Sequence, residues 1–460
     1  MSDTNSETKI TQHGQWSSRW MFVMAATGSA VGLGNIWKFP YMTGKSGGGA
    51  FVIVYLVCIA LIGLPVLMAE ISLGRRGRQS PVNAMKNLIA EAKASKYWVA
   101  IGWSGMLAGF LILSYYSVIA GWTLVYIFKT ALGDFVGLPS DQIQGQFGVL
   151  VADPLQLIIW HSVFMLMVMI VLVRGVERGL EVAVRFLMPA LLALLGLLLY
   201  YAITAADFQA GVDFMFKADF SKLTFGVFIS AMGHAFFTLS LAMGAIMVYG
   251  AYLPKNISIA TAAVPIVIAD TAVAILAGLI IFPIVFANGL EPAAGPSLIF
   301  ETLPVAFGQM PGGTFWGTIF FVLLAFAAWT SAISLIEPAV AWVVEKGVSR
   351  VSSVFLVGGL TWLVGLLTVF SFNELAFEFE FAGLPKSAGF FDAIDILTSI
   401  IMLPIGGILI AIFCGWIMPR AAIKEELELS GLIDRWWIAS VCYVAPVGVS
   451  IVMIYLIFGN

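Results

Sequence analysis

Long apolar segments follow one another along almost the whole chain, separated by short polar connections. A helix that crosses a membrane needs about 20 such residues. Eleven segments meet this length: residues 20–42, 50–72, 98–128, 155–174, 182–204, 225–252, 257–287, 314–344, 351–371, 394–417 and 436–458. The pattern therefore predicts an all-α polytopic membrane protein with eleven transmembrane helices. Residues 1–19 are polar and lack an apolar core with a cleavage site, so we expect a cytoplasmic tail and no signal peptide.

Composition and charge agree with this prediction and give an orientation. Of the 460 residues, 60% are apolar and 11% are charged, whereas soluble proteins carry roughly 25% charge. If the N-terminus lies inside, 17 of the 23 Lys and Arg residues fall in inner segments, and loops rich in these residues stay cytoplasmic. With an odd number of spans, the C-terminus is then outside. The net charge of −3 leaves no basic excess for nucleic acid.

Two of the predicted helices carry small residues and hydroxyls near mid-membrane. The first has three glycines and an Asn within residues 28–35, and the sixth has Thr238, Ser240 and Gly244. Gly costs about 1 kcal/mol relative to Ala in a helix interior, and unwound backbone persists in a membrane only where it lines a cavity. Close packing between helices is the alternative explanation for either segment alone.

The positions of these two segments favour broken helices over close packing. They open the two halves of a five-plus-five pattern, residues 20–204 and 225–417, with residues 436–458 as an eleventh helix of the same integrated domain. Interrupted helices at corresponding places in two halves are typical of transporters built from inverted repeats. The ends of half-helices present free N–H groups to an anion and free C=O groups to a cation.

Charged and hydroxyl side chains inside the predicted membrane region point to a site. An ionised Asp270 in the seventh span costs several kcal/mol unless it faces a partner or water; a protonated, structural Asp is the alternative. Thr330, Ser331 and Ser334 lie close to one helical face of the eighth span, where they provide either an ion site or hydrogen bonds between helices. Hard cations such as sodium prefer oxygen ligands of this kind.

Several motifs carry a resemblance to a known family. They are Trp16-Ser-Ser-Arg19, Gly28-Ser-Ala-Val-Gly-Leu-Gly-Asn35-Ile-Trp-Lys-Phe-Pro40, Gly47-Gly-Gly-Ala-Phe51, Gly233-His-Ala-Phe-Phe-Thr-Leu-Ser240 and Thr330-Ser331 ahead of Glu337-Pro338. In this order and spacing, the chain resembles the neurotransmitter:sodium symporters, especially bacterial amino-acid members such as the leucine transporter and the shorter eleven-helix forms. The resemblance implies a bacterial inner membrane, contact with lipid and no enzymatic activity.

The resemblance also implies two sodium sites and a substrate site. One sodium would be held by Asp270, the side chains of Asn35 and Thr238, the carbonyls of Ala30 and Thr238, and the substrate carboxylate. The other would be held by the carbonyls of Gly28, Val31 and Ala327 and the hydroxyls of Thr330 and Ser331. An amino acid would be bound by Ala30, Gly32, Gly34, Ile112, Tyr116, Phe237, Ser240, Ala242, Met243, Ser331 and Leu335.

Gating residues are implied by the same resemblance. Phe237 and Tyr116 would close the substrate site, and Lys38 with Asp395, both near the outer end of the bundle, would form the outer gate. At the inner gate Trp16, Tyr252 and Glu345 are in place, but His13 stands where the family usually has Arg. Gly179 and Pro189 have the spacing with which the family unwinds the inner half of the fifth helix; a static kink at Pro is the alternative.

Departures from the family pattern refine the expected substrate and ions. Gly32 replaces the Asp of monoamine carriers, so the substrate is expected to bring its own carboxylate. Asp270 stands where many relatives have Asn, and we expect its fixed negative charge to replace the chloride that animal members of the family require. Met243 replaces the Phe that is common in the family and makes the pocket wall more adaptable, and Ala242 narrows the pocket relative to Gly. Together they favour a medium-sized aliphatic amino acid.

The resulting hypothesis is sodium-coupled import of a hydrophobic amino acid by alternating access. The main alternative is a proton-coupled carrier of the same architecture, in which Asp270, Glu337 or His234 carries the proton. The sequence has no His-Glu-x-x-His motif and no repeated filter loop, which argues against a membrane metalloprotease and an ion channel. The oligomeric state stays open.

Overall fold

The computed structural model describes residues 14–292 and 298–458, and most of this part of the chain is helical. The first ten α-helices are α1 (Arg19–Ala30), α2 (Phe39–Lys45), α3 (Gly49–Cys58), α4 (Leu64–Gly77), α5 (Pro81–Ala92), α6 (Ala100–Leu132), α7 (Ser140–Val151), α8 (Pro154–Leu172), α9 (Glu181–Ala205) and α10 (Phe208–Phe216). The others are α11 (Phe225–Thr238), α12 (Ala245–Ala251), α13 (Ile259–Ala287), α14 (Leu303–Gln309), α15 (Gly313–Val344), α16 (Arg350–Phe370), α17 (Gly389–Asp395), α18 (Leu403–Ile412), α19 (Arg420–Leu427), α20 (Gly431–Ala439) and α21 (Ala445–Phe458).

Short elements join or extend these helices. The π-helical turns are η1 (Gly34–Lys38), η2 (Ile59–Gly63), η4 (Val176–Leu180), η6 (Leu298–Thr302), η7 (Ile396–Met402), η8 (Phe413–Ile417) and η9 (Ser440–Val444), and the 3₁₀ turns are η3 (Lys96–Val99) and η5 (Phe220–Lys222). Two antiparallel strands, β1 (Phe379–Phe381) and β2 (Leu384–Lys386), form a hairpin with Phe379 opposite Lys386.

Nine continuous helices in the described part of the chain are long and apolar enough to cross a membrane. They are Gly49–Gly77, Lys96–Leu132, Pro154–Leu172, Val176–Ala205, Ile259–Ala287, Gly313–Val344, Arg350–Phe370, Gly389–Ile417 and Gly431–Phe458. Each coincides with a predicted span. The two predicted spans outside this set are the first and the sixth, which are interrupted.

Both interruptions lie where the glycines and hydroxyls predicted them. α1 ends at Ala30, Val31 is extended with φ −68° and ψ 110°, and helical structure resumes at Gly34. α11 ends at Thr238, and three left-handed residues follow before α12: Ser240 at φ 53°, Ala242 at φ 60° and Gly244 at φ 75°. A run of left-handed residues cannot continue a right-handed helix. The prediction of broken first and sixth helices is confirmed.

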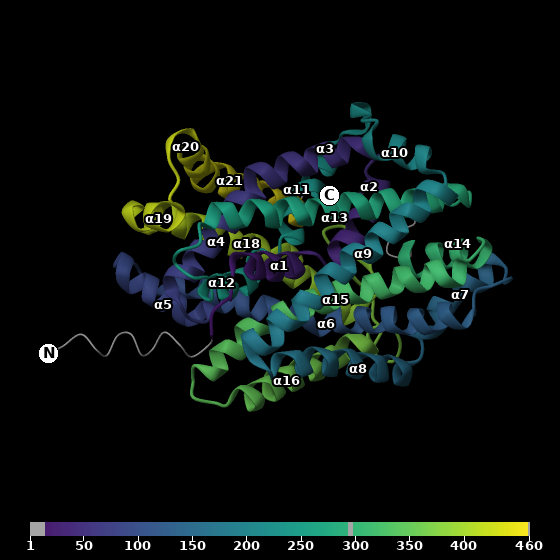
Figure 1. The fold of residues 1–460 in the computed structure, drawn as a ribbon, viewed down its shortest axis with the longest axis horizontal. Coiled ribbons are helices and arrows are strands. Elements are labelled where there is room, and N and C mark those ends of the chain that lie inside the picture. The colour runs from purple at the N-terminus through teal and green to yellow at the C-terminus, as the bar shows by residue number, and fades with distance from the viewer. Residues whose placement is uncertain (1–13, 293–297, 459–460) are drawn as a thin grey trace.

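The interrupted helices occupy the centre of the bundle. α1 is surrounded by α12, α13, α9 and α15 (Figure 1). The long helices α6 and α15 pack closely against each other, because a Cβ on Gly109 would lie 2.6 Å from the carbonyl oxygen of Leu335. The outer helices α8, α9 and α16 expose large apolar side chains such as Ile159, Phe186 and Phe355. A core of buried small residues within an apolar exterior fits a bundle surrounded by lipid.

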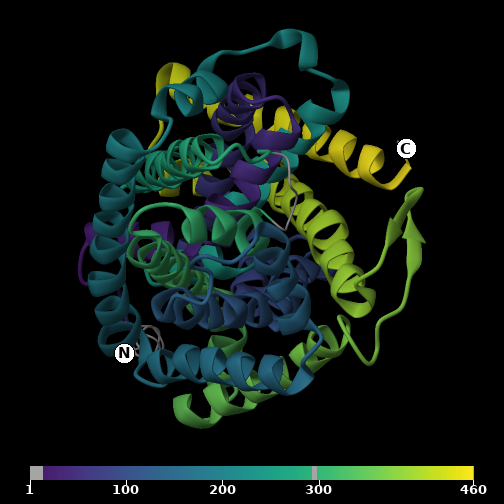
Figure 2. The same cartoon turned by 90° about the vertical axis from the view of Figure 1, so that its right-hand side faces the viewer.

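The connecting helices gather at two opposite ends of the molecule. α5, α19 and α20 lie at the left of Figure 1, and α7, α10 and α14 lie at the right; we name these the α5 end and the α14 end. The hairpin β1–β2 lies at the periphery (Figure 2). The sequence analysis left α5, α7, α10 and α14 as connections, because each has at most 12 residues and lacks a membrane-length apolar run.

Candidate functional site

A cavity lies between the two interruptions. It is lined by Ser29, Ala30, Gly32, Leu33, Gly34, Ile112, Tyr116, Phe237, Thr238, Ser240, Met243, Ser331 and Leu335. Ten of the eleven residues expected to bind substrate are among them. The lining comes from α1, η1, α6, α11, α15 and the turn after α11. Distant parts of the sequence therefore meet at the two breaks.

Ala242 is the exception, and its expected role in narrowing the pocket is wrong. It is absent from the cavity lining, and its Cβ lies 2.9 Å from where a Cβ on Gly406 would be. Its amide donates a hydrogen bond to Glu70 Oε2 at 2.9 Å. The left-handed backbone at Ala242 turns the methyl group away from the cavity and toward α18.

Main-chain amides of the first break face the hydroxyl of Tyr116 and the side chain of Asn35. The Leu33 amide donates to Tyr116 Oη at 3.2 Å, and the Gly32 amide donates to Asn35 Oδ1 at 3.0 Å. A Cβ on Gly32 would lie 2.5 Å from Ser331 Oγ and 2.9 Å from Tyr116 Oη. An added Cβ would be too close to both oxygens, which explains the glycine at this position. The main-chain amides and the tyrosine hydroxyl form one polar wall of the cavity.

A buried cluster of oxygen groups adjoins this wall. Asn35 Nδ2 donates to Asp270 Oδ1 at 2.7 Å and to Thr238 Oγ1 at 3.1 Å, and Thr238 Oγ1 lies 3.2 Å from Asp270 Oδ2. All three side chains are buried. The structure thus brings together the three side chains predicted for the first sodium site, beside Ala30. A carboxylate with hydroxyl and amide oxygens fits an alkali cation.

A second oxygen cluster lies where α15 contacts the end of α1. Ser331 Oγ donates to the carbonyls of Gly28 at 3.3 Å and Val31 at 3.0 Å, and Thr330 Oγ1 donates to the carbonyl of Ala327 at 3.0 Å. All five residues predicted for the second sodium site meet here. Their oxygens are neutral, which suits a monovalent cation in a buried site.

Two residues of the site were missed by the sequence analysis. Glu70 in α4 is fully buried and accepts the Ala242 amide within the second break. Ser29 in α1 donates to Ser334 Oγ at 2.7 Å, and its carbonyl accepts from Ser240 Oγ at 2.9 Å. An acid within the apolar run 50–72 was a visible signal for Glu70, whereas nothing in the sequence indicates the partners of Ser29.

The expected outer gate is not paired in this structure. Lys38 Nζ lies 4.5 Å from the ring centroid of Phe237. Asp395 instead accepts from Ser399 Oγ at 2.8 Å and from Tyr115 Oη at 3.3 Å. No ion pair joins Lys38 to Asp395 among the described residues. Lys38 instead lies against the ring of Phe237, a contact that sequence spacing does not predict.

The segment before α1 packs against α12 and the residue that follows it. The Trp16 amide donates to the carbonyl of Tyr252 at 3.1 Å, and Trp16 Nε1 donates to the carbonyl of Tyr249 at 3.0 Å. Tyr252 Oη donates to Glu337 Oε1 at 2.9 Å, and Glu337 also pairs with Arg350 at 2.5 Å. Trp16 and Tyr252 thus meet as expected. The pair between Glu337 and Arg350, which contacts Tyr252, was not expected from the sequence.

The other residues expected at this gate have different surroundings. Glu345 accepts from the Ser80 amide at 2.6 Å and from Asn83 Nδ2 at 2.7 Å, so it contacts the start of α5. His13 lies outside the described residues. Ser17 donates from its amide to Glu181 at 2.7 Å, which ties the N-terminal segment to the start of α9.

The fifth membrane helix is helical on both sides of the residues expected to unwind it. Gly179 lies in the π-helical turn η4, and Pro189 lies inside α9, which continues to Ala205. A Cβ on Gly179 would lie 2.3 Å from the carbonyl oxygen of Val171, so close contact with α8 is sufficient reason for this glycine. The unwound form is not seen in this conformation.

Two broken helices, a buried cavity between them and two adjoining oxygen clusters define a membrane transporter with inverted repeats. The model of the sodium:neurotransmitter symporter family matches residues 13–137 and 140–457, and the chain belongs to this family. It is therefore a sodium-dependent transporter and has the fold of that family.

Relatives and a solved structure agree. The chain is 37% identical to the uncharacterized sodium-dependent transporter YhdH of Bacillus subtilis, over 96% of this chain and 97% of that protein. It is 32% identical to an uncharacterized sodium-dependent transporter of Haemophilus influenzae, over 98% and 100%. The crystal structure of MhsT in complex with L-phenylalanine matches with a TM-score of 0.87 and 40% identity, over 96% of this chain and 99% of that one.

Proposed function

We propose that the protein imports a hydrophobic amino acid together with sodium by alternating access across a bacterial inner membrane. The observation that carries this proposal is the contact between the cavity and the Asn35–Thr238–Asp270 cluster, since Thr238 belongs to both. A substrate carboxylate placed against the amides near Gly32 lies next to the first cation site. Each ligand then raises the affinity for the other, which is the basis of coupling.

The lining favours a zwitterion with an apolar side chain. The lining contains no acidic or basic residue. The part of it that would hold the substrate side chain is formed by Ile112, Phe237, Met243 and Leu335. Ala242 does not face the cavity, so it does not narrow the space for the substrate side chain. We therefore include aromatic amino acids among the proposed substrates. The complex of MhsT with L-phenylalanine supports this choice.

We further propose two sodium ions, bound at the two oxygen clusters. A cation that moves inward gains about 2.3 kcal/mol per 100 mV of membrane potential. The ions have different surroundings: the first lies beside the Asp270 carboxylate, and the second has neutral oxygens from α1 and α15. Sodium binding and substrate binding are therefore expected to be linked mainly through the first site.

We also propose that transport does not require chloride. Asp270 is buried beside the hydroxyl-bearing residues Thr238 and Thr271, where its negative charge balances the first sodium ion. A neutral residue at this position would leave the cation without a counter-ion inside the protein. A bound anion would then be needed in its place.

Radiolabelled uptake into proteoliposomes tests the proposal. L-phenylalanine, L-leucine and L-lysine are offered with an inward gradient of Na⁺, K⁺ or choline, with chloride or gluconate as the anion. We expect uptake of the two apolar amino acids with Na⁺ alone and with either anion. Uptake driven by a proton gradient without sodium would instead support the proton-coupled alternative, for which Glu337 is poorly suited because both of its oxygens bind Arg350.

A further inference from the structure

Arg75, Arg76 and Arg78 lie at the C-terminal end of α4 and bind neighbouring segments. Within residues 74–78, Arg75 and Arg78 donate to main-chain carbonyls of the connection between α12 and α13. Arg78 Nη1 lies 2.8 Å from the carbonyl oxygen of Leu253, and Arg75 Nη1 bonds the carbonyl of Ile257. Carbonyls after a helix C-terminus lack intrahelical donors, and arginine side chains can supply them.

α12, which precedes this connection, packs directly against α4. A Cβ on Gly74 would lie 2.0 Å from the carbonyl oxygen of Met247, and a Cβ on Gly250 would lie 2.7 Å from that of Ile71. The backbones of the two helices therefore touch. Tyr249 of α12 and Tyr252, the residue after this helix, offer their carbonyls to Trp16.

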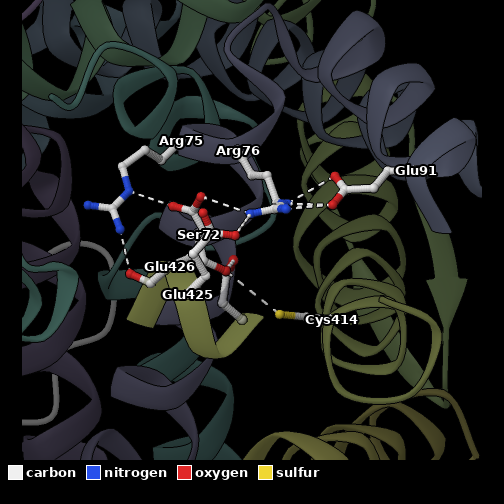
Figure 3. A network of polar contacts seen from close by, with 8 residues as sticks. Ser72, Arg75, Arg76, Glu91, Cys414, Glu425 and Glu426 are labelled. Carbon is white, nitrogen blue, oxygen red and sulfur yellow. Dashed lines mark hydrogen bonds and ion pairs between the residues drawn. The ribbon is translucent and has the colours of Figure 1, made fainter. Parts of the chain in front are cut away.

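α19 holds Arg75 in its place. Glu426 Oε2 accepts from Arg75 Nε at 2.6 Å, and the Glu426 carbonyl also accepts from Arg75 (Figure 3). The two side chains are 4% and 7% exposed. Arg76 extends the network to Glu91 at 2.6 Å and to Glu425 at 3.1 Å. Breaking a buried pair leaves an uncompensated charge, which is strongly unfavourable.

We propose that Arg75 and Arg78 are positioning residues for transport: they keep the α12–α13 connection against α4, and Glu426 of α19 keeps Arg75 in position. This inference rests on the proposed function, alternating access, in which one end of the protein opens while the other is closed. When Glu426 loses its charge, Arg75 leaves Ile257. The end of α12 then becomes free to separate from Trp16, and the protein populates a form that is open at the α5 end.

The chain provides a matched pair of variants on one helix. Glu426→Gln removes the buried carboxylate, whereas Glu425→Gln removes an acid that is 69% exposed and whose one ion-pair partner in the described part of the chain is Arg76. Arg78→Gly is a second test that does not depend on a buried pair. Arg78 has φ 56°, a conformation that glycine adopts without strain, so this variant loses the Leu253 contact while the turn itself is not weakened.

Hydrogen exchange of the purified full-length protein, in sodium chloride with and without L-phenylalanine, is the direct measurement. We expect amides of residues 247–258 to exchange about tenfold faster in Glu426→Gln and Arg78→Gly, since a hydrogen bond to a charged group shifts an equilibrium by roughly that factor. Glu425→Gln should match the unmodified protein. Equal exchange in all proteins, or faster exchange spread evenly over the chain, would overturn the proposal.

Uptake kinetics separate positioning from general stability. Because only the form closed at the α5 end binds external substrate, its depletion raises the apparent Kd, which equals the intrinsic Kd divided by the remaining fraction of that form. We expect KM for L-phenylalanine to rise several-fold in Glu426→Gln with a smaller change in kcat, and to be unchanged in Glu425→Gln. A fall in kcat alone contradicts the proposal. If the unmodified protein fails to bind L-phenylalanine, the proposed function fails while the exchange experiment still tests the arginine contacts.

Discussion

Gly32 has little room for a side chain in the cavity lining. A methyl group there would lie within 3 Å of both Ser331 Oγ and Tyr116 Oη. Overpacking of this kind costs about 1–3 kcal/mol, so we expect Gly32→Ala to weaken substrate binding by roughly 10- to 100-fold. Equilibrium binding of radiolabelled L-phenylalanine in sodium chloride measures the loss.

Gly226→Ala is the control for this substitution. Gly226 lies in α11, and the nearest atom to an added Cβ is Tyr455 Oη at 3.5 Å, an ordinary contact. Its affinity should equal that of the unmodified protein. Equal affinities for Gly32→Ala and Gly226→Ala would show that the substrate does not approach the first break.

Substitution of Asp270 tests whether transport is independent of chloride. Asp270→Asn keeps the shape of the side chain but removes the charge beside Asn35 and Thr238. We expect uptake without chloride to fall by about 100-fold or more, because a charged partner in a buried ion site contributes roughly 3 kcal/mol. Uptake is compared in sodium gluconate and sodium chloride, and recovery in chloride is the expected signature. Unimpaired uptake in gluconate would remove Asp270 from the sodium site.

Among the elements, the second break depends on a contact from a neighbouring helix. Three left-handed residues between Ser240 and Gly244 would be unfavourable without support, and Glu70 of α4 supplies it by accepting the Ala242 amide at 2.9 Å. Glu70→Ala leaves this buried amide without its acceptor. We expect a loss of about 1–3 kcal/mol in stability, measured by thermal unfolding in detergent with sodium present.

Glu91→Gln is the matched control for Glu70→Ala. Glu91 pairs with Arg76 at the surface of α5, and exposed pairs contribute about 0–1 kcal/mol. Its melting temperature should therefore stay close to that of the unmodified protein. A melting temperature of Glu70→Ala equal to that of Glu91→Gln would show that the break does not need the Glu70 carboxylate.

Helix-level features were the most predictable from the sequence. Length and apolarity were enough for the spans, and Gly and hydroxyl residues at mid-membrane located both breaks. Directions of single side chains were not predictable, because they depend on packing: the φ angle of Ala242 turns it toward Gly406, and the ring of Phe237 attracts Lys38 away from Asp395. The connecting helix α5 was missed because Glu345 and neighbouring helices stabilise it through contacts distant in sequence.

At the scale of the whole molecule, the orientation in the membrane can be tested. The excess of Lys and Arg predicts that the α5 end faces the cytoplasm. Leu384 in the hairpin and Glu425 in α19 are both exposed, so a cysteine that replaces either residue is accessible to a thiol reagent. In a variant without Cys58, Cys414 and Cys442, an impermeant thiol reagent added to whole cells should label the hairpin cysteine and spare the α19 cysteine. The reverse labelling would invert the predicted topology.

The backbone contact between α4 and α12 has a consequence for the design of inhibitors. A helix of seven residues is too short to be stable by itself, so α12 takes its rigidity from α4, with Gly74 and Gly250 leaving no gap between them. A small molecule cannot wedge into that seam. The contact between Trp16 and the carbonyls of Tyr249 and Tyr252 is the one that a blocker entering from the α5 end should target.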